Sequence, residues 1–140
     1  MYGAPLPTET SCQAMSVHFV SLRIGTRHLN AEIHRPTTVT DGLPPLLALH
    51  GISRDAKGIA REFSGPCAAR GQTLIVPRFS NRYWPHFQRI GGVRPDQALL
   101  SLLSIVQDMG LAETNRIVLF GYTGGAQLAH RFAMLYPQRV

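Results

Sequence analysis

Residues 116–132 read RIVLFGYTGGAQLAHRF, and this stretch decides the fold. The apolar run Ile117 to Phe120 is typical of a strand buried on both faces of a parallel sheet. From Gly125 to Leu135 apolar residues recur at helical spacing, which predicts a helix. Between the two, Gly121 to Gly125 must form a sharp turn, and we expect its central residue, Thr123, to adopt a positive φ. The residues expected to face inward from the helix are Leu128, Phe132 and Leu135.

Length and composition describe a globular chain. Its 140 residues fit one domain with a sizeable core, and 44% of them are hydrophobic. The net charge is +6, but the basic residues are spread singly, so we expect no nucleic-acid partner. Met1 to Ser16 lacks the features of a signal peptide, and no stretch has the roughly 18 apolar residues of a membrane span. We therefore expect a cytoplasmic protein with no membrane contact.

The two cysteines, Cys12 and Cys67, stand in no metal or redox spacing, so we predict two free thiols and no metal site. Cys67 lies within a helical pattern and is expected to be buried there as a small apolar residue.

The order of the predicted elements indicates an α/β fold with a mostly parallel sheet. We expect residues 1–15 to be a flexible segment and residues 16–140 to form one domain. An N-terminal antiparallel hairpin comes first, and three strand-helix pairs follow. Pro66 is expected to kink or restart the first helix. The predicted strands are 16–24, 27–34, 46–49, 73–76 and 117–120, and the predicted helices are 55–70, 94–109 and 125–135.

Ligands of open α/β sheets bind at the carboxyl ends of the strands. Two candidate loops follow such ends: residues 50–53, which read HGIS, and the turn at 121–125. The loop at 77–93 also follows a strand and is rich in aromatic residues. Its rings either line a substrate pocket or cover the core, and the sequence leaves both alternatives open. The candidates for pocket residues are Phe79, Tyr83 and Trp84.

These features together resemble the first half of an α/β-hydrolase, over residues 16–140. The segment GYTGGAQLAHRF at 121–132 is similar to the nucleophile elbow and its helix in esterases and polyester depolymerases, with Thr123 where the family pattern Gly-x-Ser-x-Gly has Ser. The resemblance implies a carboxylic ester substrate, an imidazole base and no cofactor. It also implies an oxyanion hole formed by the backbone N–H groups of Ile52 and Gly124. The positions it implies as support for the turn and loop are His50, Gly51, Gly121, Tyr122 and Gly125.

In that family an acid and then a histidine base follow the nucleophile along the chain. Residues 124–140 contain no Asp or Glu, and their one histidine, His130, lies within a predicted helix. We therefore expect a truncated half-domain whose sheet is incomplete on the C-terminal side, with an apolar edge strand open to self-association or to a complementing chain. Such a chain alone is expected to have no useful esterase activity. Two functions stay open: an ester hydrolase acting through Thr123 once completed, or a non-catalytic pseudoenzyme or ligand-binding module.

Overall fold

The computed structural model of the protein describes residues 13–140. Cys12 and most of the segment predicted to be flexible, residues 1–15, lie outside the described residues. The first strand already begins at Met15.

An antiparallel hairpin opens the fold, as predicted. Strand β1 (Met15–Ile24) pairs with β2 (Arg27–Pro36) through a turn at Gly25, where φ is +62°. Side chains alternate along β1, so Val20 and Leu22 are buried while Phe19 is exposed on the other face.

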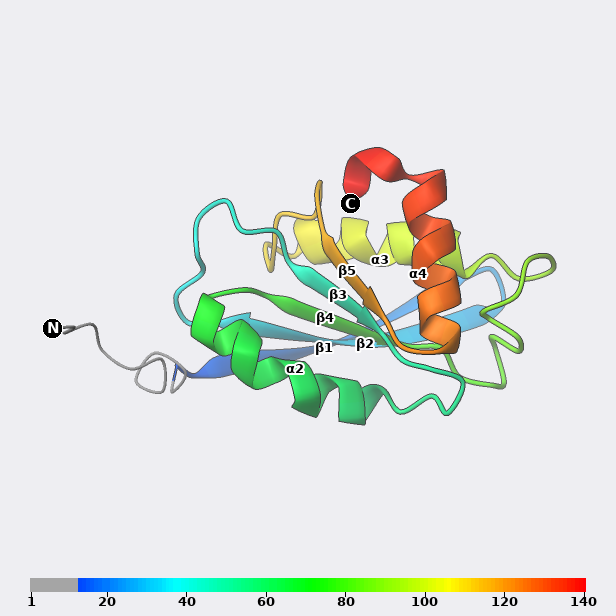
Figure 1. Cartoon of the computed structure of the whole chain (residues 1–140), viewed down its shortest axis with the longest axis horizontal. Coiled ribbons are helices and arrows are strands. Elements are labelled where there is room, and N and C mark those ends of the chain that lie inside the picture. The colour runs from blue at the N-terminus through cyan, green and yellow to red at the C-terminus, as the bar shows by residue number, and fades with distance from the viewer. Residues whose placement is uncertain (1–12) are drawn as a thin grey trace, which may run out of the picture.

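Three strand-helix pairs follow the hairpin (Figure 1). The strand order is β1-β2-β4-β3-β5, with β3 parallel to both β4 and β5 and with β2 antiparallel to β4. The predicted α/β fold with its N-terminal hairpin is thus confirmed, and the predicted bounds are right to within two residues. Within the described residues, strand β5 lies at an edge of the sheet and pairs only with β3. The elements are β3 (Leu46–Leu49), α2 (Ala56–Arg70), β4 (Leu74–Arg78), α3 (Pro95–Asp108), β5 (Val118–Gly121), α4 (Gly124–Leu135) and a short 3-10 helix, Pro137–Arg139.

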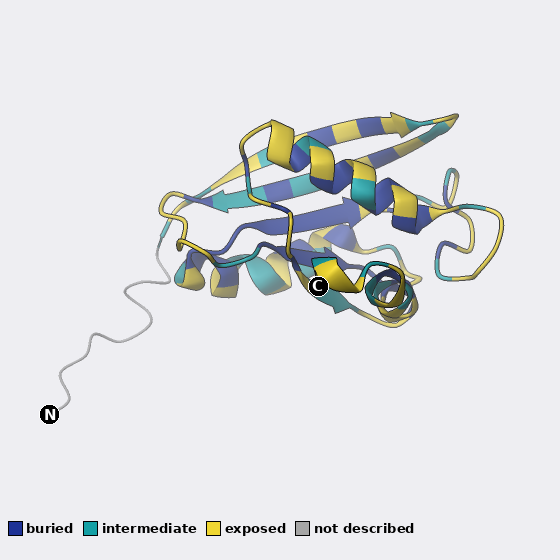
Figure 2. Cartoon of the chain, turned by 90° about the horizontal axis from the view of Figure 1, so that it is seen from above, coloured by how far each residue is buried: buried dark blue, intermediate teal, exposed yellow. Residues whose placement is uncertain are grey.

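The helices cover both faces of the sheet, α2 on one side and α3 with α4 on the other (Figure 1). Every residue of β3 is buried, which explains its continuous apolar sequence (Figure 2). The larger cluster of buried side chains lies on the side of α3 and α4, where Leu99, Leu102 and Phe132 are fully buried. The smaller one lies under α2 and contains Cys67, which is a free thiol as predicted.

Two details of the helices bear on the predictions. Helix α2 runs without interruption through Pro66, so of the two predicted outcomes, a kink or a restart, the restart does not occur. Pro66 has no N–H to donate to the carbonyl of Glu62, but both residues are exposed, so that carbonyl is accessible to water. Leu135 does not face inward but is 49% exposed, because α4 ends at this residue and Tyr136 packs on Phe132 instead. Among the described residues, no helix has the length and apolar character to cross a membrane.

Candidate functional site

The turn between β5 and α4 has the geometry of a type II′ β-turn. Thr123, the first central residue, has φ 49° and ψ −111°, and the N–H of Gly125 donates to the carbonyl of Tyr122 over 2.8 Å. Glycine dominates this position because positive φ is unfavourable for residues with a Cβ, and most of all for β-branched ones. The positive φ predicted for Thr123 is therefore present, and it is a strained conformation.

Glycines around the turn allow backbone segments to touch. A Cβ on Gly125 would lie 2.6 Å from the carbonyl oxygen of Leu49 at the end of β3. A Cβ on Gly121 would overlap the Gly125 peptide in the first turn of α4. Neither position accepts a larger residue without moving the helix away from the strands, so these glycines are explained by packing.

The two loops predicted to form a site do meet. The hydroxyl of Thr123 lies directly over Gly51, so close that a Cβ on that glycine would overlap Oγ1. The side chain of Ile52 packs against Gly124, where a Cβ would lie 2.7 Å from its Cγ2. Among residues 13–140, neither the N–H of Ile52 nor that of Gly124 donates to another protein group. Two free backbone donors therefore flank the Thr123 turn.

His50 connects the loop after β3 to the loop after β4. Its Nε2 accepts a hydrogen bond from the N–H of Phe79 at 2.9 Å, and Nδ1 lies 2.7 Å from the carbonyl of Gly51, to which it donates in the matching tautomer. Burial lowers the pKa of His50, and the charges of Arg54 and Arg78 lower it further. Both ring nitrogens are thus engaged in a neutral imidazole, which suits a supporting role better than that of a base.

Arg54, which the sequence analysis did not single out, adds a second connection between these loops. Its Nη1 donates to the carbonyls of Phe79 at 2.6 Å and Trp84 at 3.3 Å, and its guanidinium lies 5.1 Å from the ring centre of Phe87. Its backbone has a φ of 62°, unusual for a residue with a side chain. No local pattern predicts this role, since the partners lie far away in the sequence.

The aromatic residues after β4 lie mostly in the core. Phe79 and Trp84 are each 1% exposed, and Phe79 stacks on Phe87 with 5.5 Å between ring centres. The indole N–H of Trp84 donates to the carbonyl of His28 at 2.8 Å. Of the three candidate pocket residues, Tyr83 alone keeps partial exposure. The sequence left open whether these rings line a substrate pocket or cover the core, and Phe79 and Trp84 cover the core.

No described residue is placed to activate the hydroxyl of Thr123. Within residues 13–140, no hydrogen bond joins this hydroxyl to a histidine, an aspartate or a glutamate. His130 is exposed on α4, and the buried carboxylate of Asp96 is occupied by Arg94 and by the hydroxyl of Tyr136. The described part of the chain also contains no group of three residues suited to hold a metal ion.

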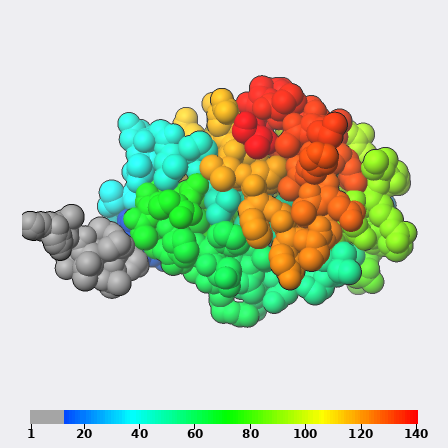
Figure 3. All heavy atoms as spheres, in the orientation of Figure 1, coloured from blue at the N-terminus to red at the C-terminus, as the bar shows by residue number. Residues whose placement is uncertain are grey.

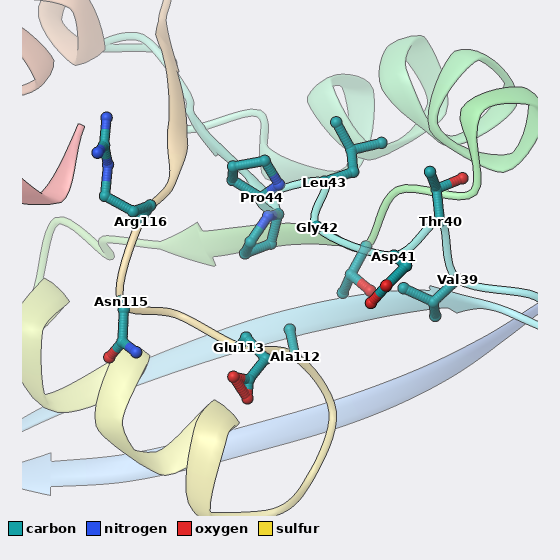
Figure 4. A pocket seen from close by; sticks show the side chains of 12 residues that line it. Val39, Thr40, Asp41, Gly42, Leu43, Pro44, Ala112, Glu113, Asn115 and Arg116 are labelled. Atoms are coloured by element: carbon teal, nitrogen blue, oxygen red, sulfur yellow. The ribbon is translucent and has the colours of Figure 1, made fainter.

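Two hollows lie beside the sheet, at opposite ends of its strands. One, of about 680 Å³, lies between α2 and the edge strand β5 and reaches Gly51 and Tyr122 beside the turn. The other, of about 490 Å³, lies between the loop at 39–45 and residues 112–116 (Figure 4). In it Arg116 points away from Glu113 and Asn115, so the polar groups do not converge on one point, and we assign no site there.

Solved structures share this fold. The chain matches a Staphylococcus aureus fluorophosphonate-binding serine hydrolase, FphF, with a TM-score of 0.71 and 16% identity over 90% of this chain and 54% of the other. It matches poly(aspartic acid) hydrolase-1 of Sphingomonas sp. KT-1 with a TM-score of 0.69 and 17% identity, over 89% and 52%. For LpqC, a poly(3-hydroxybutyrate) depolymerase of Bordetella parapertussis, the values are 0.68 and 22%, over 90% and 48%.

The sequence itself matches no family model and no curated protein. The chain spans about half the length of the solved structures it resembles. These neighbours are hydrolases of the α/β-hydrolase fold. The protein thus has an α/β-hydrolase fold, in a partial form with β5 at the edge of its sheet.

Proposed function

We propose that the chain carries the nucleophile side of a carboxylic-ester hydrolase site, with Thr123 as the acyl acceptor. The observation that carries this proposal is the placement of the Thr123 hydroxyl over Gly51, next to the free N–H groups of Ile52 and Gly124. In acyl transfer, a pair of fixed N–H donors stabilises the negative oxygen of the tetrahedral intermediate. The hydrolase neighbours support a hydrolytic reaction of this kind.

In the proposed reaction, Oγ1 of Thr123 adds to the ester carbonyl carbon, and the N–H groups of Ile52 and Gly124 donate to the resulting oxyanion. The bond from carbon to the alcohol oxygen then breaks. The hydroxyl proton passes through a general base to the departing alcohol, and water later cleaves the acyl group from Thr123. We propose that this base comes from a part of the hydrolase fold beyond the described residues.

The edge of β5 is the proposed docking place for that part or for a second copy. The N–H groups of Val118 and Tyr122 donate toward the neighbouring strand β3. Alternation along a strand therefore turns the backbone groups of Leu119 and Gly121 outward. Val118 is 44% exposed, and β5 carries neither a charge nor a proline that would discourage pairing.

An esterase assay tests the proposal. On a nitrophenyl acetate, we expect the chain alone to hydrolyse far more slowly than an intact esterase, because without a base only the oxyanion donors contribute, with at most about 10³ to 10⁴ over water. The Thr123→Ser variant fused to the C-terminal half of a hydrolase of this fold is expected to be active, with Thr123→Ala in the same fusion as the inactive control. Hydrolysis by the unfused chain at the rate of an intact esterase, abolished by Thr123→Ala, would contradict the expected slow rate.

A second candidate function is a non-catalytic binding module. It is favoured by the β-branched side chain of Thr123, whose methyl group crowds the approach to the hydroxyl, and by the missing base. A Thr123→Ser fusion that folds correctly and stays inactive would support this second function.

A further inference from the structure

We propose that the candidate site binds esters that carry a carboxylate, in either their acyl or their alcohol part. That the ligand is an ester rests on the proposed function, whereas its carboxylate is inferred from the charges near Thr123.

The loop after β4 contains singly spaced arginines with no carboxylate among them, since no Asp or Glu occurs between Glu62 and Asp96. The arginines from the end of β4 to the start of α3 are Arg78, Arg82, Arg89 and Arg94.

Contacts place this loop against the Thr123 turn. A Cβ on Gly124 would lie 3.3 Å from Cβ of Gln88, so the middle of the loop borders the residue that follows Thr123. Arg131 of α4 also donates to the carbonyl of Gln88, at 2.6 Å. In Figure 3 the yellow-green atoms of the loop lie beside the orange atoms where α4 begins. Arg89, which follows Gln88 and is exposed, therefore lies at the rim of the site.

Arg54 lies in the loop after β3, and Arg78, at the end of β4, lines a neighbouring hollow together with Glu32 and Lys57. The guanidinium of Arg54 is bound to the carbonyl of Phe79, the residue directly after Arg78. The two charges are close enough that Arg78 lowers the pKa of Arg54, after the larger effect of burial. Arg54 is anchored through its hydrogen bonds, while Arg78 is exposed and makes no hydrogen bond with residues 13–140.

The nearby carboxylates do not neutralise this rim. Asp96 pairs with Arg94, and Glu32 lies 3.0 Å from Nε2 of His34, a contact that is an ion pair only when this histidine is protonated. Asp55 caps the first turn of α2 by accepting the N–H of Gly58 at 2.9 Å. Asp55 and Glu62 line the hollow that reaches Gly51 and Tyr122, together with Arg61, so these carboxylates lie on the α2 side of the turn. On the side of the loop after β4, no described carboxylate pairs with Arg54, Arg78 or Arg89.

Unbalanced cations at the rim of a site attract anions, and the attraction weakens with added salt. A carboxylate on the substrate would meet a guanidinium in charge-assisted hydrogen bonds, while its ester group lies at Thr123. A neutral ester of the same size gains nothing from these charges. We therefore expect the site to select esters by their charge, largely independent of the length of the ester's carbon chain.

A pair of esters tests this inference without requiring turnover. We would titrate the isotope-labelled chain with monomethyl succinate and with its neutral counterpart, dimethyl succinate, and follow the amide signals of Ile52 and Gly124. We expect monomethyl succinate to bind more tightly. We also expect its affinity to fall with salt between about 0.02 and 0.5 M, since the Debye length shrinks over this range.

Single substitutions locate the binding charge. Arg89→Gln should weaken binding of monomethyl succinate about fourfold, the attraction of two unit charges about 5 Å apart in water. Arg78→Gln should weaken it less, because Arg78 lines a neighbouring hollow. Arg116→Gln is the matched control, because Arg116 precedes β5 at the opposite end of the strand and is also exposed. It should leave the affinity unchanged. Circular dichroism of each variant would show whether it is folded.

Several results would overturn the inference: equal affinity for the two esters, no shift with either, or an equal loss in Arg116→Gln. Binding of a DNA duplex through Arg78 and Arg89, without a preference between the esters, would instead assign these charges to phosphate backbones. The esterase assay is independent of these outcomes. An inactive fusion that still prefers monomethyl succinate would refute the proposed reaction and leave the binding inference in place.

Discussion

Replacing Gly125 with alanine should destabilise the fold strongly, because the contact between α4 and β3 leaves no room for a methyl group. The new Cβ would lie 2.6 Å from the carbonyl oxygen of Leu49 and 3.0 Å from its carbonyl carbon, and it would overlap the carbonyl oxygen of His50. Carbon and oxygen atoms in ordinary van der Waals contact lie about 3.5 Å apart, so α4 must shift by about 1 Å. Overpacking of this kind costs about 1 to 3 kcal/mol, and the rigid backbone partners here point to about 3.

Gly65→Ala is the matched control for this change. Gly65 also lies in a helix, but a Cβ there would meet nothing within 4 Å. We expect this variant to be more stable by about 0.8 to 1 kcal/mol, the helix preference of alanine over glycine. Urea denaturation followed by circular dichroism gives the free energy of unfolding of both variants. A loss below about 0.5 kcal/mol in Gly125→Ala would refute the steric reasoning, since it would fall within the range of an ordinary surface change.

Three further predictions concern buried groups and strain. Burial lowers the pKa of His50 below its ordinary 6.5, so below that pH the unfolded chain binds more protons than the folded chain. We therefore expect the free energy of unfolding to be highest above pH 6.5 and to decrease as the pH falls below it, which urea titrations at several pH values would show. Tyr136→Phe removes a hydrogen bond of 2.8 Å to the buried carboxylate of Asp96 and should cost about 1.5 kcal/mol in the same assay. Thr123→Gly should raise the melting temperature, because it relieves about 1 kcal/mol of strain; an unchanged or lower melting temperature would contradict this.

The sequence predicts the elements of the fold well because the apolar runs are unambiguous. All four residues from Leu46 to Leu49 are apolar and buried, and the glycines and prolines around the helices mark their ends. The strand order is a different matter. Nothing local indicates that β4 inserts between β2 and β3, because that depends on how the sheet twists and packs its helices.

The candidate site is predictable only where its residues follow a motif. His50, Gly51 and Thr123 lie next to strand ends and are recognisable by that position. Arg54 is not, because its carbonyl partners, Phe79 and Trp84, come from another loop. A composition rich in aromatic residues does not tell whether a ring faces a pocket or the core, and here the packing of Phe79 against Phe87 decides it.

The strain at Thr123 shows which part of the turn determines its shape. A β-branched residue at φ 49° is unfavourable by itself, so neighbouring contacts must impose that conformation. Gly121 and Gly125 supply them, because their lack of a Cβ lets β5, the first turn of α4 and the end of β3 come into backbone contact. The residue at position 123 therefore does not determine the architecture of the turn. Under the proposed function it supplies the reactive hydroxyl, and a change from threonine to serine alters that group while the turn, the two free N–H donors and the fold remain. Activity and stability can therefore be tested separately at this position.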